Sequence, residues 1–598
     1  MSPHLQFMCG PLLRYDTVID GVWHGAVMIV TADQGSVYSP SPYLSLEWDP
    51  SSPLFSNGAD TPKSPKTVYY SKQITGEEIW VYYGTAGTFT FWRFMIEIPL
   101  SRYEMGVSYQ INNGARLEFF VPAIGQNLRW AVHSCNGFSA GINPDDFKGP
   151  GFVSGYDPLW VDLLNKHYEK PFHALVGGGD QIYCDKVTQE PEIQDWINKK
   201  LVTDKINYQL TDEMRFAIDR FYFSHYCLMF RSGAFARCTR TIPMVSNCLD
   251  DHDLIDGFGS YPADLQSSPV FNAIGARGYF FFLLFQQFTV DAVDGSLDMH
   301  PHPNRALIMG ELGPWIPSCS HSLLTYLGPQ AQLLLLDCRA ERRKERIVSE
   351  KTYKVILDRI RALPTSVEHL VLLLGVPIAY PRMNFLESAL ESKLNPFIAL
   401  ARSGFGMSGF VNKFNKEAEL LDDLNDHWTA THHKAERNWL VQELQKVALS
   451  QKLRITFLSG DVHCAAVGLF KSLVKSKKGP GVDPYQDHRY MLNVVTSAIV
   501  NTPPPAGVLK MVGLLGKKTH KTLHSAQTDE VMVPLFKQDT DGTPLKANLV
   551  MGRRNWCQVD WDESSGDLIF DIRVEKEKGY GTSVSYPIHA PAPRWSNT

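Results

Sequence analysis

Runs of β-branched and aromatic residues, separated by turn-forming residues, dominate the N-terminal part of the chain. Such runs predict short β-strands, and the turn Asn112-Asn113-Gly114 is typical of a tight hairpin. We therefore expect an antiparallel β-sandwich over residues 1–125. The strand-like runs lie at 22–31, 67–70, 78–83, 88–98 and 116–121.

From residue 126 onward, apolar strand-like runs alternate with segments of helical length. These runs lie at 128–134, 173–176, 243–247, 332–337, 369–374, 454–458 and 491–496. Before the run at 454–458, apolar residues recur at helical spacing within 434–449. The alternation predicts a layered α/β domain over 126–550. The strand pattern at 568–574 predicts that residues 551–598 form a closing β-hairpin and a tail packed on this domain.

Composition narrows the class of protein. The chain has 598 residues, 44% of them hydrophobic and 20% charged, as in a folded protein of more than one domain. Its net charge of -5 gives no reason to expect nucleic acid as a partner. The ten cysteines contain no Cys-x-x-Cys pair, which favours a reducing compartment over a disulfide framework.

Membrane and targeting signals are weak. The N-terminus lacks the basic start and apolar core of a secretory signal, and the apolar stretch 279–285 is too short to span a bilayer. We expect a cytoplasmic protein without a transmembrane segment. Association with a membrane surface stays open.

Four of the strand-like runs end in side chains that could bind a metal, at the position where α/β domains usually place their sites. The first is Cys135. A buried free cysteine is the more common fate of such a residue, whereas a thiolate ligand would suit a transition metal. The second follows three glycines: if a helix begins after Asp180, Tyr183 shares its face and completes a pair of oxygen ligands. The alternative is a glycine turn in which Asp180 caps a helix.

The third segment places Asp250, Asp251, His252 and Asp253 directly after a strand. Three neighbouring carboxylates repel one another unless a cation or solvent screens them, so the alternatives are a metal site and a solvated loop. Within a site, one carboxylate could bind metal while His252 donates a proton.

In the fourth segment, the i,i+2 spacing puts Asp461 and His463 on one side of an extended chain, as a chelating pair would require. The alternative is a histidine satisfied by the backbone.

Together these motifs resemble PhoD-like alkaline phosphatases. The segments 177–185 (GGGDQIYCD), 249–253 (LDDHD) and 459–463 (SGDVH) resemble three signatures of the family, in the family's order. Residues 337–339 (DCR) and 426–428 (DHW), with Arg437, resemble two further segments. The resemblance covers about residues 129–500, and the N-terminal β region resembles the fungal branch.

The resemblance implies the metallophosphatase fold, with two facing β-sheets flanked by helices, and a centre of two metal ions. One set of residues would hold an iron-like ion: Cys135, Asp180, Tyr183 and Asp461. Asp180 would bridge to a second ion, calcium or another divalent cation, with Asp251 and His463 nearby. By analogy with the wider superfamily, His252 would protonate the leaving oxygen and Arg339 would hold the phosphate.

Two positions depart from the family pattern. Leu249 stands where the family has Trp, which alters packing and the shape of the site. Asp256-Gly257 stands where two Asn are expected, which bears on the identity of the second metal.

The expected activity is hydrolysis of a phosphomonoester or phosphodiester, either a small molecule or a lipid, by a metal-activated water. Segment 503–521 is the best candidate for selecting the substrate. The alternatives are a catalytically inactive scaffold on the same fold and a different metal-dependent hydrolase. If the centre exists, the carboxylates of Asp180 and Asp461 must converge, with Tyr183 and His463 facing the same point.

Overall fold

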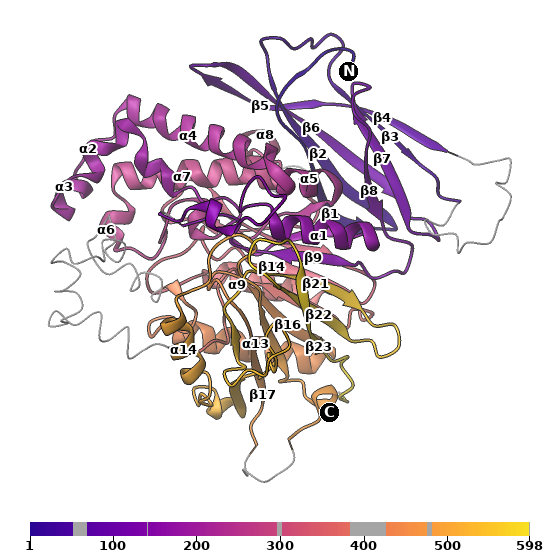
Figure 1. Ribbon diagram of the computed structural model, residues 1–598, viewed down its shortest axis with the longest axis vertical. Helices are drawn as coiled ribbons and strands as arrows, with labels where there is room; N and C mark the ends of the chain where they lie inside the picture. Colours follow the sequence, from indigo (N-terminus) through magenta and orange to yellow (C-terminus); the bar gives the residue numbers. More distant parts are fainter. Residues whose placement is uncertain (52–68, 140, 296–301, 383–425, 475–480, 597–598) are drawn as a thin grey trace.

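The computed structural model describes residues 1–51, 69–139, 141–295, 302–382, 426–474 and 481–596. Two large β-sheets pack face to face and carry helices on their outer faces, while a small third sheet covers the N-terminal end (Figure 1). This arrangement confirms the expected layered α/β fold and its facing sheets.

The first sheet has ten strands in the order β23-β22-β21-β9-β10-β11-β1-β2-β6-β5. Strands β9, β10, β11 and β1 run parallel, and the remaining pairs are antiparallel. Its strands are β1 Gln6–Ile19, β2 Val22–Ala32, β5 Glu77–Gly84, β6 Gly87–Pro99, β9 Trp130–His133, β10 Ala174–Gly177, β11 Met244–Val245, β21 Asn555–Trp561, β22 Leu568–Glu575 and β23 Ser583–Ala590.

The second sheet has nine strands, in the order β12-β13-β14-β15-β16-β18-β17-β19 with β20 beside β17. Its central strands β14, β15, β16 and β18 are parallel. Its strands are β12 Leu307–Leu312, β13 Cys319–Tyr326, β14 Ala331–Leu335, β15 His369–Leu373, β16 Arg454–Ser459, β17 Ala465–Ser472, β18 Met491–Val495, β19 Thr528–Met532 and β20 Val550–Met551.

The small sheet packs on the N-terminal strands of the ten-stranded sheet and completes the expected antiparallel sandwich. Its order is β4-β3-β7-β8. Asn112 and Asn113 adopt positive φ between β7 and β8, as a tight hairpin turn requires. The strands are β3 Tyr43–Trp48, β4 Tyr70–Thr75, β7 Met105–Ile111 and β8 Leu117–Val121.

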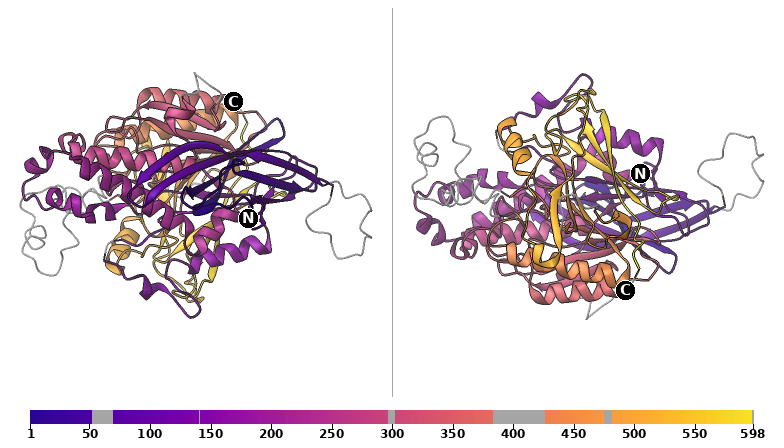
Figure 2. Two further views of the ribbon diagram at one scale, coloured as in Figure 1. Left: turned by 90° about the horizontal axis from the view of Figure 1, so that it is seen from above. Right: turned by 90° about the horizontal axis from the view of Figure 1, so that it is seen from below.

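Three apolar layers hold these elements together. The inner layer joins the two large sheets, with Val176 and Val371 on its two sides. A second layer, rich in aromatic residues, packs four helices on the ten-stranded sheet: α1 (Pro158–Glu169), α4 (Asp212–Arg231), α5 (Gly233–Thr241) and α7 (Pro269–Phe282). A third layer packs α9 (Glu350–Arg361) and α13 (Lys434–Gln451) on the other sheet (Figures 1 and 2). Burial of apolar area on this scale is the main source of stability.

The helices of the described residues are as follows: α1 Pro158–Glu169, α2 Gln194–Ile197, α3 Val202–Ile206, α4 Asp212–Arg231, α5 Gly233–Thr241, α6 Ala263–Gln266, α7 Pro269–Phe282, α8 Asp291–Asp294, α9 Glu350–Arg361, α13 Lys434–Gln451 and α14 Ala506–Leu515. Among them, none combines the length and the apolar character that crossing a bilayer requires.

All three predicted segments of the chain contribute to the ten-stranded sheet. Strand β1 pairs with β11, and β21 pairs with β9. The N-terminal sandwich and the C-terminal hairpin therefore share one hydrogen-bonded sheet with the strands that carry the candidate site. The boundaries at 125 and 550 stay a prediction.

Candidate metal centre

The candidate residues lie just past the carboxyl ends of parallel strands in both large sheets. Cys135 follows β9, Asp180 follows β10, and Asp251 follows β11. Asp461 and His463 follow β16 in the facing sheet. Because the sheets pack face to face, these separate segments meet in one place.

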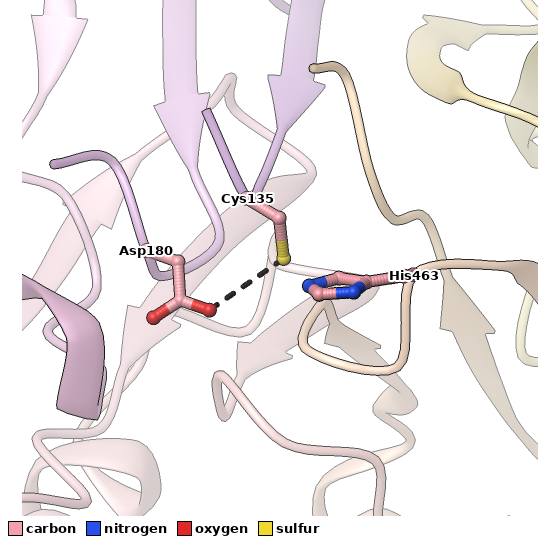
Figure 3. Close-up of side chains that lie close together, drawn as sticks. All are labelled: Cys135, Asp180 and His463. Carbon is pink, nitrogen blue, oxygen red and sulfur yellow. Dashed lines mark hydrogen bonds between the residues drawn. The ribbon is translucent and has the colours of Figure 1, made fainter. Parts of the chain in front are cut away.

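Cys135, Asp180 and His463 form the first cluster, in which the Cys135 sulfur lies between the other two side chains (Figure 3). The Cys135 Sγ is 3.6 Å from Asp180 Oδ2, and possible ligand atoms of all three residues lie within 4.8 Å of one another. The Tyr183 hydroxyl is 3.2 Å from His463 Nε2. A thiol, a carboxylate, a phenol and an imidazole thus face a common point.

Asp180 belongs to two further clusters. One contains Asp251 and His252, and the other contains Asp250 and Asp461. A carboxylate shared in this way stands where a residue that bridges two ions would stand. Asp180 and Asp461 converge in one of these clusters, while Tyr183 and His463 meet each other beside Asp180 in the first cluster.

The donor atoms fit cations. Asp180 Oδ1 and Asp250 Oδ2 are buried, and neither accepts a hydrogen bond from the described residues. Burial raises the pKa of the Asp180 and Asp461 carboxyls and of the Cys135 thiol well above their ordinary values. Unpaired buried carboxylates are strongly unfavourable, and a bound cation would compensate them. The mixture of soft and hard ligands suits a transition metal beside a harder cation.

Several of these residues are held in an unusual backbone conformation. Cys135, Asp180, Asp461 and His463 have φ values of 53°, 56°, 68° and 50°. L-residues other than Gly visit this left-handed region at a cost of roughly 1–3 kcal/mol each, and such residues gather at functional sites. Four of the ten non-Gly residues with positive φ in the described chain belong to this centre.

This backbone corrects three local expectations. Within the described residues 181–184 no helix follows Asp180, and Tyr183 reaches the centre from an irregular loop. Asp180 caps no helix; its backbone N–H donates to Asp253 Oδ2 at 3.0 Å. Asp461 and His463 do not lie on an extended segment, because both adopt positive φ.

His252 is oriented by two neighbours. Its Nδ1 lies 2.8 Å from Asp185 Oδ2, and its ring stacks on Tyr183 with centroids 4.5 Å apart. Burial alone would lower the pKa of His252, but the nearby carboxylates of Asp185 and Asp251 hold it well above its ordinary value. The side chains of His252 and Asp461 are 23% and 24% exposed, so the centre is open to solvent on their side.

Arg339 is buried behind the acidic cluster. Its Nε donates to Asp250 Oδ1 at 2.6 Å, its Nη1 donates to Asp426 Oδ1 at 2.7 Å and to the Phe258 carbonyl, and its Nη2 also contacts Asp426. Asp337 accepts the Arg339 backbone N–H at 3.0 Å. It therefore fixes the backbone of Arg339.

The sequence did not single out three residues of the centre. Asp250 supplies one of the unpaired oxygens, although the sequence favoured its neighbour. His427 Nε2 lies 3.5 Å from Asp461 Oδ2, and the resemblance of 426–428 to a family segment was a usable signal for it. Asn501 Nδ2 donates to the Tyr183 hydroxyl at 2.9 Å. Its place in a loop past β18 carries no comparable signal.

The two departures from the family pattern have distinct surroundings. Leu249 is buried in the aromatic layer that packs helices on the ten-stranded sheet. The backbone N–H of Gly257 donates to Asp251 Oδ2 at 2.7 Å, and that of Asp256 donates to Asp185. Both backbone groups therefore bind carboxylates of the centre.

Comparison with known proteins agrees with this picture. The family model of PhoD-related phosphatases matches residues 100–396 and 397–586, well over half of the chain. Uncharacterized protein YGR266W of Saccharomyces cerevisiae is 34% identical over 616 residues, an alignment that covers 96% of this chain and 84% of the yeast protein. It supports the fungal branch inferred from the N-terminal region.

A solved structure, described as a dimetal phosphatase from Danio rerio, is 10% identical and has a TM-score of 0.27, with 77% of this chain and 98% of that chain covered. So low a score carries no argument. The family match and the yeast relative are sufficient: the chain belongs to the PhoD-related phosphatase family.

Proposed function

We propose that this protein is a metal-dependent phosphoesterase that hydrolyses a phosphomonoester or a phosphodiester at a centre of two metal ions. One observation carries the proposal. Side chains from three other segments converge on Asp180, and two buried carboxylate oxygens in these clusters have no hydrogen-bond partner among the described residues. The family membership of the chain supports the same conclusion.

The proposed ligands divide into two sets around Asp180. Cys135, Tyr183 and Asp461 would hold an iron ion with it, and Asp251 and His463 would lie near a calcium ion or another divalent cation. When bound, such ions would clamp the phosphate oxygens and lower the pKa of a water toward neutrality.

His252 is the proposed general acid. Asp185 engages Nδ1, which leaves Nε2 as the nitrogen that can donate a proton to the departing oxygen. The neighbouring carboxylates favour the protonated imidazole that this step requires. Stacking on Tyr183 fixes the plane of the ring.

For Arg339 we propose a positioning role instead of the direct phosphate contact that the resemblance implies. A guanidinium has five N–H donors. Asp250, Asp426 and the Phe258 carbonyl engage all three of its nitrogens, and the side chain is fully buried. Its task would be to orient Asp250 and, at 3.5 Å, Asp251.

The test is an assay of purified protein on a phosphomonoester and a phosphodiester, with metal analysis of the same sample. We expect bound metal and hydrolysis in the wild type, and loss of both in Asp180→Ala. Asp162→Asn is a matched control, because Asp162 is another buried carboxylate, bonded by Trp556 and Ser583 away from the centre. It should keep its metal content.

Two outcomes would oppose the proposal. If the wild-type protein carries no stoichiometric metal and Asp180→Ala changes neither metal content nor activity, the proposed enzymatic activity is refuted. Wild-type protein that binds metal but hydrolyses neither ester would favour the inactive scaffold.

A further inference from the structure

Helix α14 (Ala506–Leu515) has an unusual sequence for a helix at the surface. Its only charged residue is Lys510, and the rest are Ala, Gly, Val, Leu and Met. Figure 1 shows the helix at the periphery of the molecule, beside the nine-stranded sheet. A surface helix normally confines its apolar residues to one inward stripe.

The inward stripe of α14 is narrow. Val512 is buried in a small cluster with Cys464, and Val508 and Leu509 pack against the same cluster. Outside that stripe, Leu514 is 56% exposed, and Met511 and Leu515 are only partly buried. The outer face of the helix is therefore apolar and open to solvent.

Positive charge follows the apolar helix directly. Lys510, Lys517, Lys518 and Lys521 are all exposed. The sequence contains no acidic residue from Asn501 to Thr528, although the whole chain has a net charge of -5. The segment thus pairs an apolar face with a local excess of lysine.

We propose that α14 and the lysines that follow it dock the protein on an anionic lipid bilayer. Leu514 and Met511 would enter the boundary between headgroups and acyl chains, as the apolar face of an interfacial helix does. Lys517, Lys518 and Lys521 would lie among the anionic headgroups. A bilayer fits better than a protein groove, because anionic headgroups complement lysines that are spread along the segment. Acyl chains also accept an apolar face that has no particular shape.

The position of α14 gives this docking a consequence for the metal centre. The cluster under the helix contains Cys464 and, at its border, Val462, which flank His463 on both sides. Upstream of the helix, Asn501 bonds Tyr183. Docking through α14 would hold the centre against the lipid surface. The inference does not depend on the proposed hydrolysis.

Sedimentation of the full chain with vesicles tests the proposal. We expect binding to vesicles of phosphatidylcholine mixed with phosphatidylserine, little binding to phosphatidylcholine alone, and weaker binding at high salt. The double variant Lys517→Ala/Lys518→Ala should bind the anionic vesicles about 25-fold more weakly. Leu514→Asp should weaken binding on the order of tenfold.

Leu312→Asp is the matched control. Leu312 is 65% exposed and ends β12, the edge of the nine-stranded sheet opposite β19. It should bind vesicles like the wild type. Three results would overturn the proposal: no preference of the wild type for anionic vesicles, undiminished binding by Leu514→Asp, or a wild-type dimer that Leu514→Asp converts to a monomer.

Discussion

At the scale of single residues, the Asp180 carboxylate lies in an electrostatically unfavourable environment. It is buried, its Oδ1 accepts no hydrogen bond from the described residues, and Asp250, Asp251 and Asp253 lie near it. Burial and these neighbours raise its pKa well above the ordinary value. A proton and a metal ion therefore compete for the same oxygens.

Replacing Asp180 with Asn keeps the size of the side chain and removes the buried charge. We expect Asp180→Asn to lose bound metal and yet to be more stable than the metal-free wild type, by roughly 1–3 kcal/mol. Urea denaturation in the presence of a chelator measures the free energy of unfolding, and metal analysis measures the loss. A variant that keeps its metal would contradict the assignment.

His252→Ala tests the general acid. For an ester with an alkyl alcohol as leaving group, turnover should fall by roughly 10²- to 10⁴-fold, because the departing oxygen needs a proton. For a p-nitrophenyl ester the fall should be much smaller, since that leaving group departs as a stable anion. Metal content should not change. An equal loss on both esters would assign His252 a different role.

At the scale of elements, the apolar runs located most strands of the large sheets. The strand predicted at 369–374 is β15 (His369–Leu373), and the one predicted at 454–458 is β16 (Arg454–Ser459). The long first strand, β1, was missed, because Pro11 and the short apolar runs around it do not give a strand-like alternation.

Residues of the site could be predicted from the sequence only where a side chain that can bind metal comes directly after a predicted strand. Asp180 and Asp461 stand within a few residues of buried strands, so their segments were recognisable. The contacts of Asn501 depend on the path of a loop, and those of Asp426 depend on tertiary packing. The positive φ of Cys135 decides where its thiol points, and no local pattern in the sequence signals it.

Gly275, in the middle of α7, shows how a helix can support the centre at a distance. A Cβ added there would lie 1.9 Å from a ring carbon of Phe258, whose carbonyl accepts from Arg339. Gly275→Ala should therefore lower the free energy of unfolding by roughly 1–3 kcal/mol. The control is Gly507→Ala in α14, which is exposed and where no described atom lies within 4 Å of an added Cβ, so Ala should add up to about 1 kcal/mol. If both variants gain stability in urea denaturation, the close approach at Gly275 is not a constraint.

At the scale of the whole molecule, the centre lies where two sheets bring many carboxyl groups together, so its charge balance affects global stability. Burial raises the pKa of Asp250 to about 6 and that of Asp253 to about 7. In the unfolded chain the pKa of an Asp side chain is about 4. The stability that these raised pKa values confer is present at acid pH and is lost as pH rises through the folded values.

We therefore expect these two carboxyls to cost the metal-free protein stability progressively from about pH 4 to about pH 7.5, and the last part of this loss, above about pH 6.5, is the part to measure. Buried histidines such as His369, with a pKa lowered to about 4, act in the opposite direction, but only below the pKa of an unfolded histidine, about 6.5. Urea denaturation across this window, with chelator and with metal, measures the effect. With metal bound the decline should vanish; a metal-free protein that gains stability over the window would contradict the assignment.

The mixed strand order of the ten-stranded sheet also bears on how the protein is made. Strand β9, which leads to Cys135, lies between β10 and β21, and β21 begins only at Asn555. A ribosome synthesises the chain from its N-terminus, so one edge of β9 has no partner until β21, more than 400 residues further along the chain, has emerged. Unpaired edges invite wrong pairing. We expect a nascent chain stalled before β21 to require chaperone protection, and the metal centre to assemble only after β21 has been synthesised.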